Sequence, residues 1–183
     1  HMNICDKEDI KDTLKKIKPK TIFDCSAFGS YPFETNYDLI HRTNFTGLID
    51  MIEVIEHSDV SSYIHAGTSS EYGLNSKEPF ESAELVPNSQ YAISKAAASG
   101  AIKYYGKIRK IPVLNLRLYS VYGPYEDSSK LIPILCKEVL RKKLPPFANQ
   151  TTSRDFIYID DVVDAFVTAS LKIHPDIFGE SIN

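Results

Sequence analysis

Strand-like apolar segments alternate with long helical patterns along this chain, and that alternation constrains the fold more than any other feature. The segments with strand character are 21–26, 61–67, 113–118 and 154–158. The segments with helical spacing of apolar residues are 36–56, 90–109, 130–142 and 162–171. Strands that alternate with helices of this length favour a parallel sheet with helices on both faces. The sequence therefore predicts an α/β fold.

Acidic residues mark the starts of two helices, a further one near the N-terminus and the last one, at 162–171. Asp6 has the side chain of an N-cap, and the helix that follows it is expected to end at Pro19. The segment 21–26 after it reads as a buried strand. We interpret Asp160 and Asp161 as the cap of the last helix and not as a metal site, because no third ligand is apparent.

Composition excludes several classes of protein. The 183 residues are enough to enclose a substantial core, and the 43% hydrophobic content is that of an ordinary globular chain. A net charge of -3 provides no basic surface for nucleic acid or an anionic membrane. No apolar run approaches the length of about 18 residues that a membrane helix needs. The three cysteines lie far apart, which we interpret as reduced thiols of a cytoplasmic protein.

A tyrosine and a lysine four residues apart form the first candidate site. Tyr91 and Lys95 share one face of the helix predicted for 90–109. An ammonium beside a phenol lowers the phenol's pKa from about 10, and the Thr68 hydroxyl is placed to bond the same substrate oxygen. Such a group can take a proton from an alcohol while hydride leaves the carbon. Taken alone, the spacing is more often that of a solvated helix face.

The predicted topology gives this pair a context. In parallel sheets, ligands sit at the carboxyl ends of the strands. The sequence places Ser26-Ala27, Thr68-Ser69-Ser70 and Tyr119-Ser120 at three such ends. Small or hydroxylated residues at all three ends predict one continuous cleft beside Tyr91 and Lys95.

Several blocks, in order along the chain, resemble the extended short-chain dehydrogenase/reductase family, the NAD-dependent epimerases and dehydratases of nucleotide sugars. The blocks with this resemblance are 3–6, 22–27, 43–47, 68–73, 91–95, 116–124 and 153–161. The resemblance implies a Rossmann-like, doubly wound parallel sheet, a nucleotide-sugar substrate and NAD as the cofactor. NADP is not excluded, because the residue that would distinguish the two belongs to a part of the family pattern that this sequence does not show.

The resemblance also implies a role for each matching residue. Tyr91 would be the acid/base, Lys95 would hold the nicotinamide ribose and lower the Tyr91 pKa, and Thr68 would bond the reacting hydroxyl. The residues implied to contact the cofactor are Asn3, Cys25, Ser26, Ala27, Asn44, Tyr91, Lys95 and Tyr119. The residues implied to contact the substrate are Thr68, Ser69, Ser120 and Arg154. For Arg154 the role is diphosphate binding, and the alternative is a local ion pair with Asp155.

Departures from the family pattern reduce the number of reaction types that we expect for this chain. In the 4,6-dehydratases two carboxylic residues follow the threonine, whereas Ser69 and Ser70 stand there in this chain. We therefore expect epimerisation or keto-reduction, and a dehydratase or decarboxylase remains the alternative. Glu71 is displaced by one position and is expected to face away from Thr68 in an extended segment.

Two polar residues in the predicted strands need an explanation. Asp24 stands where the family often has histidine, and a carboxylate inside a strand requires a partner that the sequence does not identify. We interpret His65 as a packed or cross-strand histidine in preference to a catalytic one. Phe147 is interpreted as a buried aromatic residue in preference to one that stacks on a base.

The family begins with a strand, a glycine-rich turn and a helix that bind the pyrophosphate. No such block precedes Asn3, so we expect this chain to lack the first βαβ unit and to be inactive or nearly so in isolation. Residues 1–2 are interpreted as a tag remnant. Residues 3–183 are expected to form a partial family domain, with a cofactor-binding part at 3–125 and a mixed, substrate-binding part at 126–183.

The same family resemblance implies a homodimer. Helices 36–56 and 90–109 would form its interface, and the small residues at 96–101 would allow close packing. A non-catalytic dimerising module derived from the family is the alternative to an enzyme.

Overall fold

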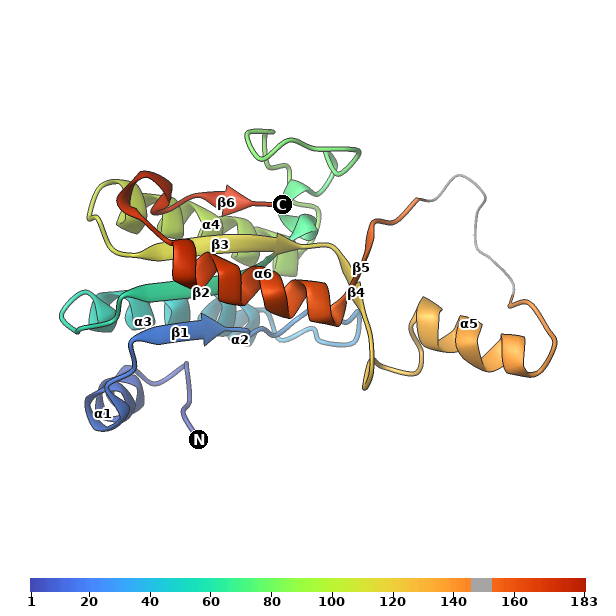
Figure 1. Cartoon of the computed structure of the whole chain (residues 1–183), viewed down its shortest axis with the longest axis horizontal. Coiled ribbons are helices and arrows are strands. Elements are labelled where there is room, and N and C mark those ends of the chain that lie inside the picture. The colour runs from blue at the N-terminus through green and yellow to red at the C-terminus, as the bar shows by residue number, and fades with distance from the viewer. Residues whose placement is uncertain (146–152) are drawn as a thin grey trace. The chain divides into compact units, whose positions relative to one another are not determined.

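The computed structural model describes residues 1–145 and 153–183 (Figure 1). The chain divides into two compact units. One consists of His1–Leu118 together with Phe166–Asn183, and the other of Tyr119–Ala165. Phe147 lies outside the described residues.

The first unit is built on a four-stranded parallel sheet with strand order β1-β2-β3-β6. Its strands are β1 (Thr21–Asp24), β2 (Ser62–Thr68), β3 (Val113–Leu118) and β6 (Ser181–Ile182). The register pairs Asp24 with His65 and Thr68 with Leu118. The α/β prediction is confirmed.

Helices cover the sheet on both faces (Figure 1). The helices of this unit are α1 (Lys7–Ile17), α2 (Tyr37–His41), α3 (Gly47–Ile55), α4 (Gln90–Lys107), and the short η2 (Ser69–Tyr72) and η3 (Pro175–Ile177). The helix α6 (Ile159–Lys172) begins in the second unit and ends in the first. Within the first unit, the Phe166 ring packs edge-on against Phe23 of β1, with centroids 6.1 Å apart.

The core lies between α1, α3, α4 and one face of the sheet. Its buried members include Ile10, Leu48, Ile52, Tyr63, Ile102 and Val113. Burying each such aliphatic side chain contributes about 1.5–3 kcal/mol relative to leaving it exposed. This core fixes α4 against β2 and so fixes the helix that carries Tyr91 and Lys95.

The predicted helix 36–56 is divided into three parts. Between α2 and α3 lies η1 (Arg42–Thr46), a π-helical turn, and the Asn36 side chain caps the start by accepting from the Leu39 amide. The wider turn places Asn44 in the interior. Such turns often occur at functional sites.

Two details of the sequence prediction were wrong. The strand predicted for 21–26 is shorter and not fully buried, because β1 is an edge strand and Phe23 is 46% exposed. Asp160 and Asp161 do not precede the last helix, because α6 already begins at Ile159 and both lie in its first turn. By contrast, the Asp6 cap is confirmed, since its side chain accepts from two amides of α1.

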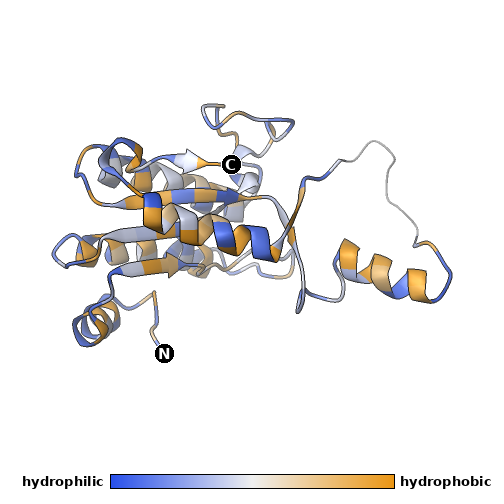
Figure 2. Ribbon diagram, viewed as in Figure 1, coloured by the Kyte–Doolittle hydropathy of each residue, from blue (hydrophilic) through white to orange (hydrophobic). Residues whose placement is uncertain are grey.

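The second unit contains a two-stranded parallel sheet of β4 (Ser120–Tyr122) and β5 (Phe156–Tyr158), and the helix α5 (Leu131–Leu140). The ring of Tyr122 contacts those of Phe156 and Tyr158. Figure 2 shows α5 as a largely hydrophobic helix, yet it has no buried residue in the described structure. Its predicted apolar stripe is therefore present, with Ile134 and Leu135 half-buried and Leu131 and Val139 exposed.

Candidate active site

Thr68 stands where β2 passes directly into η2. Its side chain accepts a hydrogen bond from the Ser70 amide at 3.2 Å, and the Glu71 carboxylate accepts one from the Thr68 amide at 3.0 Å. These two bonds form a capping box. The expectation that Glu71 faces away from Thr68 was wrong, because the segment is a helical turn and not an extended strand.

Glu71 is held in place by a buried ion pair. The Arg117 guanidinium donates to Glu71 Oε2 at 2.7 Å and to the Tyr72 hydroxyl at 2.7 Å. Both charged side chains are buried, so each depends on the other for compensation. Sequence reasoning missed this pair, although an arginine in the apolar strand β3 was a signal for it. Glu71 is therefore committed to positioning the turn.

Tyr91 lies in the first turn of α4, which is capped by Ser89. Burial raises the pKa of the Tyr91 phenol, and a hydrogen bond with the Thr68 side chain opposes that increase. The Thr68 and Tyr91 side chains thus lie close together. Burial outweighs the effect of Thr68, so the pKa of Tyr91 is raised, and the expected lowering by Lys95 is not among the causes of the shift.

Lys95 is buried one turn along the same helix. Its ammonium donates to the Ala66 carbonyl at 2.7 Å, and its Nζ lies 2.9 Å from Nε2 of His65. Burial lowers the pKa of Lys95, while the carboxylates of Asp24 and Glu71 oppose that change.

The partner that the Asp24 carboxylate requires is His65, which lies beside it on the neighbouring strand β2. Its Oδ2 lies 2.8 Å from Nδ1 of His65 and also accepts from the Tyr63 hydroxyl. Burial alone would raise the pKa of Asp24, but His65, Ser26 and Tyr63 outweigh it and hold the pKa below the usual range. The interpretation of His65 as a cross-strand histidine is confirmed.

The carboxyl end of β1 presents small residues. Cys25 and Ala27 are exposed, and the Ser26 hydroxyl donates to Asp24. Asn44 is buried and bonds both backbone groups of Phe28, the amide at 2.8 Å and the carbonyl at 2.7 Å. Asn44 therefore holds the loop after β1.

Asn3 stands apart from this group. It is exposed before α1, and its side chain accepts from the Cys5 amide. Within residues 1–145 and 153–183, no hydrogen bond joins Asn3 to the residues that follow β1.

A cavity of about 450 Å³ opens beside Tyr91. Its lining comes from the loop before α2 and from the start of α4, and includes Tyr31, Glu34, Gln90 and Tyr91. The Glu34 carboxylate accepts from the amides of Gly29 and Tyr31, which fixes the shape of that loop. A second cavity of about 900 Å³ lies between α1, α3 and the end of α4, and none of the predicted site residues lines it.

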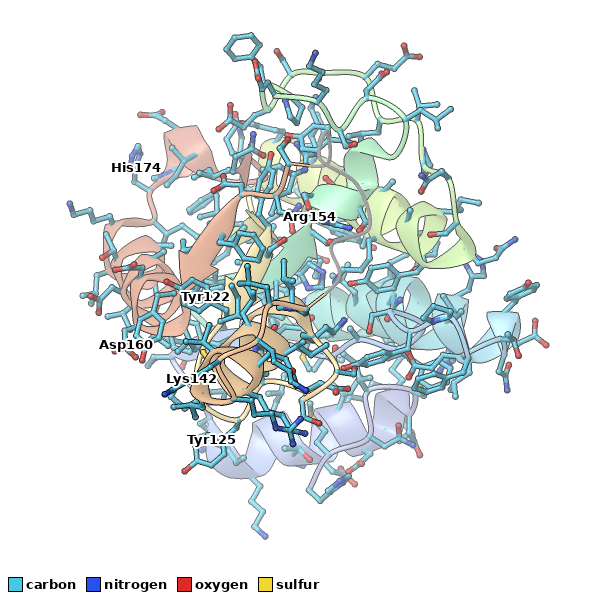
Figure 3. All side chains as sticks on the ribbon, turned by 90° about the vertical axis from the view of Figure 1, so that its right-hand side faces the viewer. Tyr122, Tyr125, Lys142, Arg154, Asp160 and His174 are labelled. Carbon is cyan, nitrogen blue, oxygen red and sulfur yellow. The ribbon has the colours of Figure 1, made fainter. Side chains whose placement is uncertain are left out.

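The remaining predicted site residues belong to the second unit. Tyr119 and Ser120 lie at the start of this unit, and the Ser120 amide donates to the Asp155 carbonyl at 2.9 Å. Arg154, labelled in Figure 3, is exposed. Among the described residues, the ion pairs of arginine are those of Arg42, Arg109, Arg117 and Arg141, and none joins Arg154 to Asp155. The single cleft across three strand ends stays a prediction.

Among the residues that the structure describes, no group of three or more His, Cys, Asp or Glu side chains could hold a metal ion. Across the same residues, none of the helices combines the length and the apolar character that a membrane span requires.

Comparison with known proteins adds to this geometry. The sequence pattern of the NAD dependent epimerase/dehydratase family matches residues 1–183. An uncharacterized UDP-glucose epimerase of Bacillus subtilis strain 168, YtcB, is 32% identical over 141 residues, which cover 76% of this chain and 44% of the relative.

Two solved structures have the same fold. UDP-glucuronic acid 4-epimerase from Bacillus cereus, in complex with UDP-glucuronic acid and NAD, superposes with a TM-score of 0.80 at 29% identity, over 97% of this chain and 57% of that one. The dTDP-glucose 4,6-dehydratase of Bacillus anthracis, in complex with NAD, gives a TM-score of 0.74 at 29% identity, over 98% of this chain and 55% of that one.

The chain thus spans between 44% and 57% of the lengths of these three proteins. The family match nevertheless extends over all 183 residues of the sequence. This chain belongs to the NAD dependent epimerase/dehydratase family.

Proposed function

We propose that this chain carries the acid/base group and part of the NAD-binding surface of a nucleotide-sugar epimerase or keto-reductase. The observation that carries the proposal is the proximity of the Thr68 and Tyr91 side chains at the carboxyl end of the sheet, with Lys95 buried one turn further along α4. A hydroxyl pair and a buried ammonium form a group suited to moving a proton at a substrate oxygen.

Each side chain has a distinct task in this proposal. Tyr91 is protonated at neutral pH at the ordinary tyrosine pKa of about 10, and burial raises that pKa further. It gives a proton to a carbonyl oxygen or takes one from the corresponding hydroxyl. A ligand that brings positive charge beside the phenol would favour the second direction. Thr68 orients that oxygen by hydrogen bonding, and Lys95 supplies the fixed cation.

The residues at the end of β1 fit a nicotinamide cofactor. Exposed Cys25 and Ala27 leave the strand end open, and the Lys95 ammonium has three donors, of which two bond His65 and Ala66 among the described residues. When bound, the cofactor would accept a hydride from the sugar carbon and return it. We propose NAD, which accompanies the enzymes from Bacillus cereus and Bacillus anthracis. None of the eight glycines forms the family's glycine-rich turn, so we expect weak NAD binding by these 183 residues alone.

The turn after Thr68 supports epimerisation or keto-reduction over dehydration. Ser69 and Ser70 offer hydroxyls and no carboxylic acid, and Glu71 is committed to Arg117 and the Thr68 amide. Water elimination needs a free acid/base pair near the oxidised sugar. The names of the Bacillus subtilis relative and the Bacillus cereus structure support a UDP-sugar as the substrate.

The test uses the complete gene product that contains this chain. It is incubated with NAD and either UDP-glucose or UDP-glucuronate, and the sugars are followed by proton NMR. An epimer without net formation of reduced cofactor identifies an epimerase. In a parallel incubation of NADH with a UDP-4-keto-sugar, stoichiometric oxidation of NADH and formation of the corresponding hydroxy-sugar identify a reductase. A 4-keto-6-deoxy product would overturn the proposal in favour of dehydration. A stable dimer that binds neither cofactor nor sugar nucleotide would favour the dimerising module.

A further inference from the structure

Three ionisable side chains form a buried chain of hydrogen bonds between the sheet and α4. Asp24 Oδ2 lies 2.8 Å from Nδ1 of His65, and Nε2 of the same ring lies 2.9 Å from Nζ of Lys95. The exposed fractions of the three residues are 7%, 2% and 1%. Water therefore does not compete for these bonds.

The chemistry of the donors fixes where the protons lie. A lysine ammonium is a donor only, so Nε2 of His65 must accept from Lys95. The ring proton then resides on Nδ1 and is donated to the Asp24 carboxylate. Asp24 also accepts from the Tyr63 hydroxyl and from Ser26, which keeps it ionised. The ring of His65 is consequently neutral and held in one tautomer.

The charged groups around the ring act in opposite directions. Asp24 and Glu71 favour a protonated His65, with the Glu71 charge compensated by Arg117, but burial and the Lys95 ammonium outweigh them and lower the His65 pKa. A proton added to Nε2 would remove the acceptor of Lys95 and place a second cation beside its ammonium. Two cations at this separation in a dry site repel each other strongly.

We propose that Asp24 and His65 are positioning residues for Lys95, and that they leave one of its three N–H groups for a ligand at the end of the sheet. The His65 ring and the Ala66 carbonyl take the other two. The inference rests on the proposed function, in which Lys95 holds the cofactor. It adds that the direction of the free N–H is set by β1 and β2, through Asp24 and His65.

The first experiment measures the tautomer and protonation state of His65 in the wild-type chain. Long-range ¹H–¹⁵N correlation spectra of the imidazole rings report the tautomer and protonation of each histidine, with exposed His57 as the reference in the same sample. We expect His65 to remain the neutral Nδ1–H tautomer well below the usual histidine pKa of about 6.5. An Nε2–H tautomer, or titration at the usual pKa, would overturn the inference.

The second experiment compares two variants at His65. Glutamine can accept from Lys95 and donate to Asp24 without titrating, whereas leucine fills the space without either bond. The Lys95 pKa is followed through its ¹³Cε resonance. We expect it to fall in His65→Leu and to stay near the wild-type value in His65→Gln.

The outcomes separate this inference from the proposed function. Equal Lys95 titration in both variants and the wild type would overturn the inference, whether or not the chain binds NAD. If the His65→Leu variant does not fold, the tautomer of His65 in the wild-type chain alone decides whether the inference holds. Failure of the complete gene product to use NAD, with the tautomer as expected, would count against the proposed function and leave the contact network unaffected.

Discussion

The carboxylate of Glu71 and the guanidinium of Arg117 form a buried ion pair, with Oε2 2.7 Å from Nε. The same carboxylate accepts from the Thr68 amide. The ion pair therefore connects β3 to the turn that presents the Thr68 hydroxyl.

Replacement of Arg117 is expected to destabilise the chain strongly. Arg117→Leu leaves the Glu71 carboxylate buried and unpaired, which costs about 3–5 kcal/mol in the free energy of unfolding. The measurement is urea denaturation followed by circular dichroism. The double variant Glu71→Leu/Arg117→Leu removes both charges and should lose less than Arg117→Leu. A double variant that is no more stable than the single one contradicts this account.

Tyr91→Phe is expected to separate catalysis from stability. The variant removes the hydroxyl that lies beside Thr68 and keeps the aromatic ring. In the complete gene product we expect turnover to fall about 10²–10⁴-fold, the contribution of a positioned acid/base group. The free energy of unfolding should change by about 0.5–1.5 kcal/mol, the net value of one hydrogen bond. Unchanged turnover, measured by NMR of the sugar product, would exclude Tyr91 as the acid/base.

The pH dependence of stability is expected to reflect His65 and Asp24. Burial and Lys95 lower the pKa of His65, so the unfolded chain binds its proton first and stability declines as the pH falls below about 6.5. The decline from His65 ends once the folded ring is protonated. The pKa of Asp24 is also lowered, so its stabilisation is complete above about pH 3.9 and is lost as the pH falls through its folded value.

Urea denaturation at a series of pH values measures this profile. His65→Gln should show a smaller decline below about pH 6.5, because glutamine does not titrate. An identical profile in the variant and the wild type would contradict the assignment to His65.

Two glycines of α4 provide a matched pair of variants. Gly100 has open space where a Cβ would stand, whereas a Cβ at Gly106 would lie 2.1 Å from the backbone nitrogen of Gly179. Gly100→Ala should therefore raise the free energy of unfolding by up to about 1 kcal/mol through helix propensity. Gly106→Ala should lower it, because two backbones must move apart. Thermal denaturation of the two variants tests the difference in sign.

A substitution at Gly100 also tests the proposal that the chain dimerises through α4. If this helix forms a close interface with a second copy, Gly100→Leu should weaken the dimer without destabilising the monomer. Sedimentation velocity measures the association. A wild-type chain that stays monomeric at high concentration would contradict the dimer proposal.

Local sequence patterns were sufficient for β2, β3 and α4, whereas the short strands β4 and β6 were not predicted. Apolar periodicity locates β2, β3 and α4 within two residues at each end. The position of Tyr91 beside Thr68 then follows from topology, because a strand end and the start of the next helix meet at the same edge of a parallel sheet.

Contacts between distant side chains could not be predicted in the same way. The partner of Asp24 lies 41 positions away, and its identity depends on the register of β1 against β2. The direction of Glu71 depends on whether the chain turns or extends after Thr68, and the ion pair with Arg117, 46 positions away, stabilises the turn. The π-helical turn at Asn44 is likewise specified by its tertiary contacts and not by periodicity.

The Asn44 side chain has one further consequence. It bonds both backbone groups of Phe28 and the Ser94 hydroxyl, at 2.9 Å, so a loop residue is tied to the turn of α4 next to Lys95. The loop after β1 and the start of α4 should therefore open as one cooperative unit in hydrogen exchange. The Phe28 amide, although in a loop, should exchange as slowly as the helical amides around Ser94, and Asn44→Ala should accelerate its exchange first.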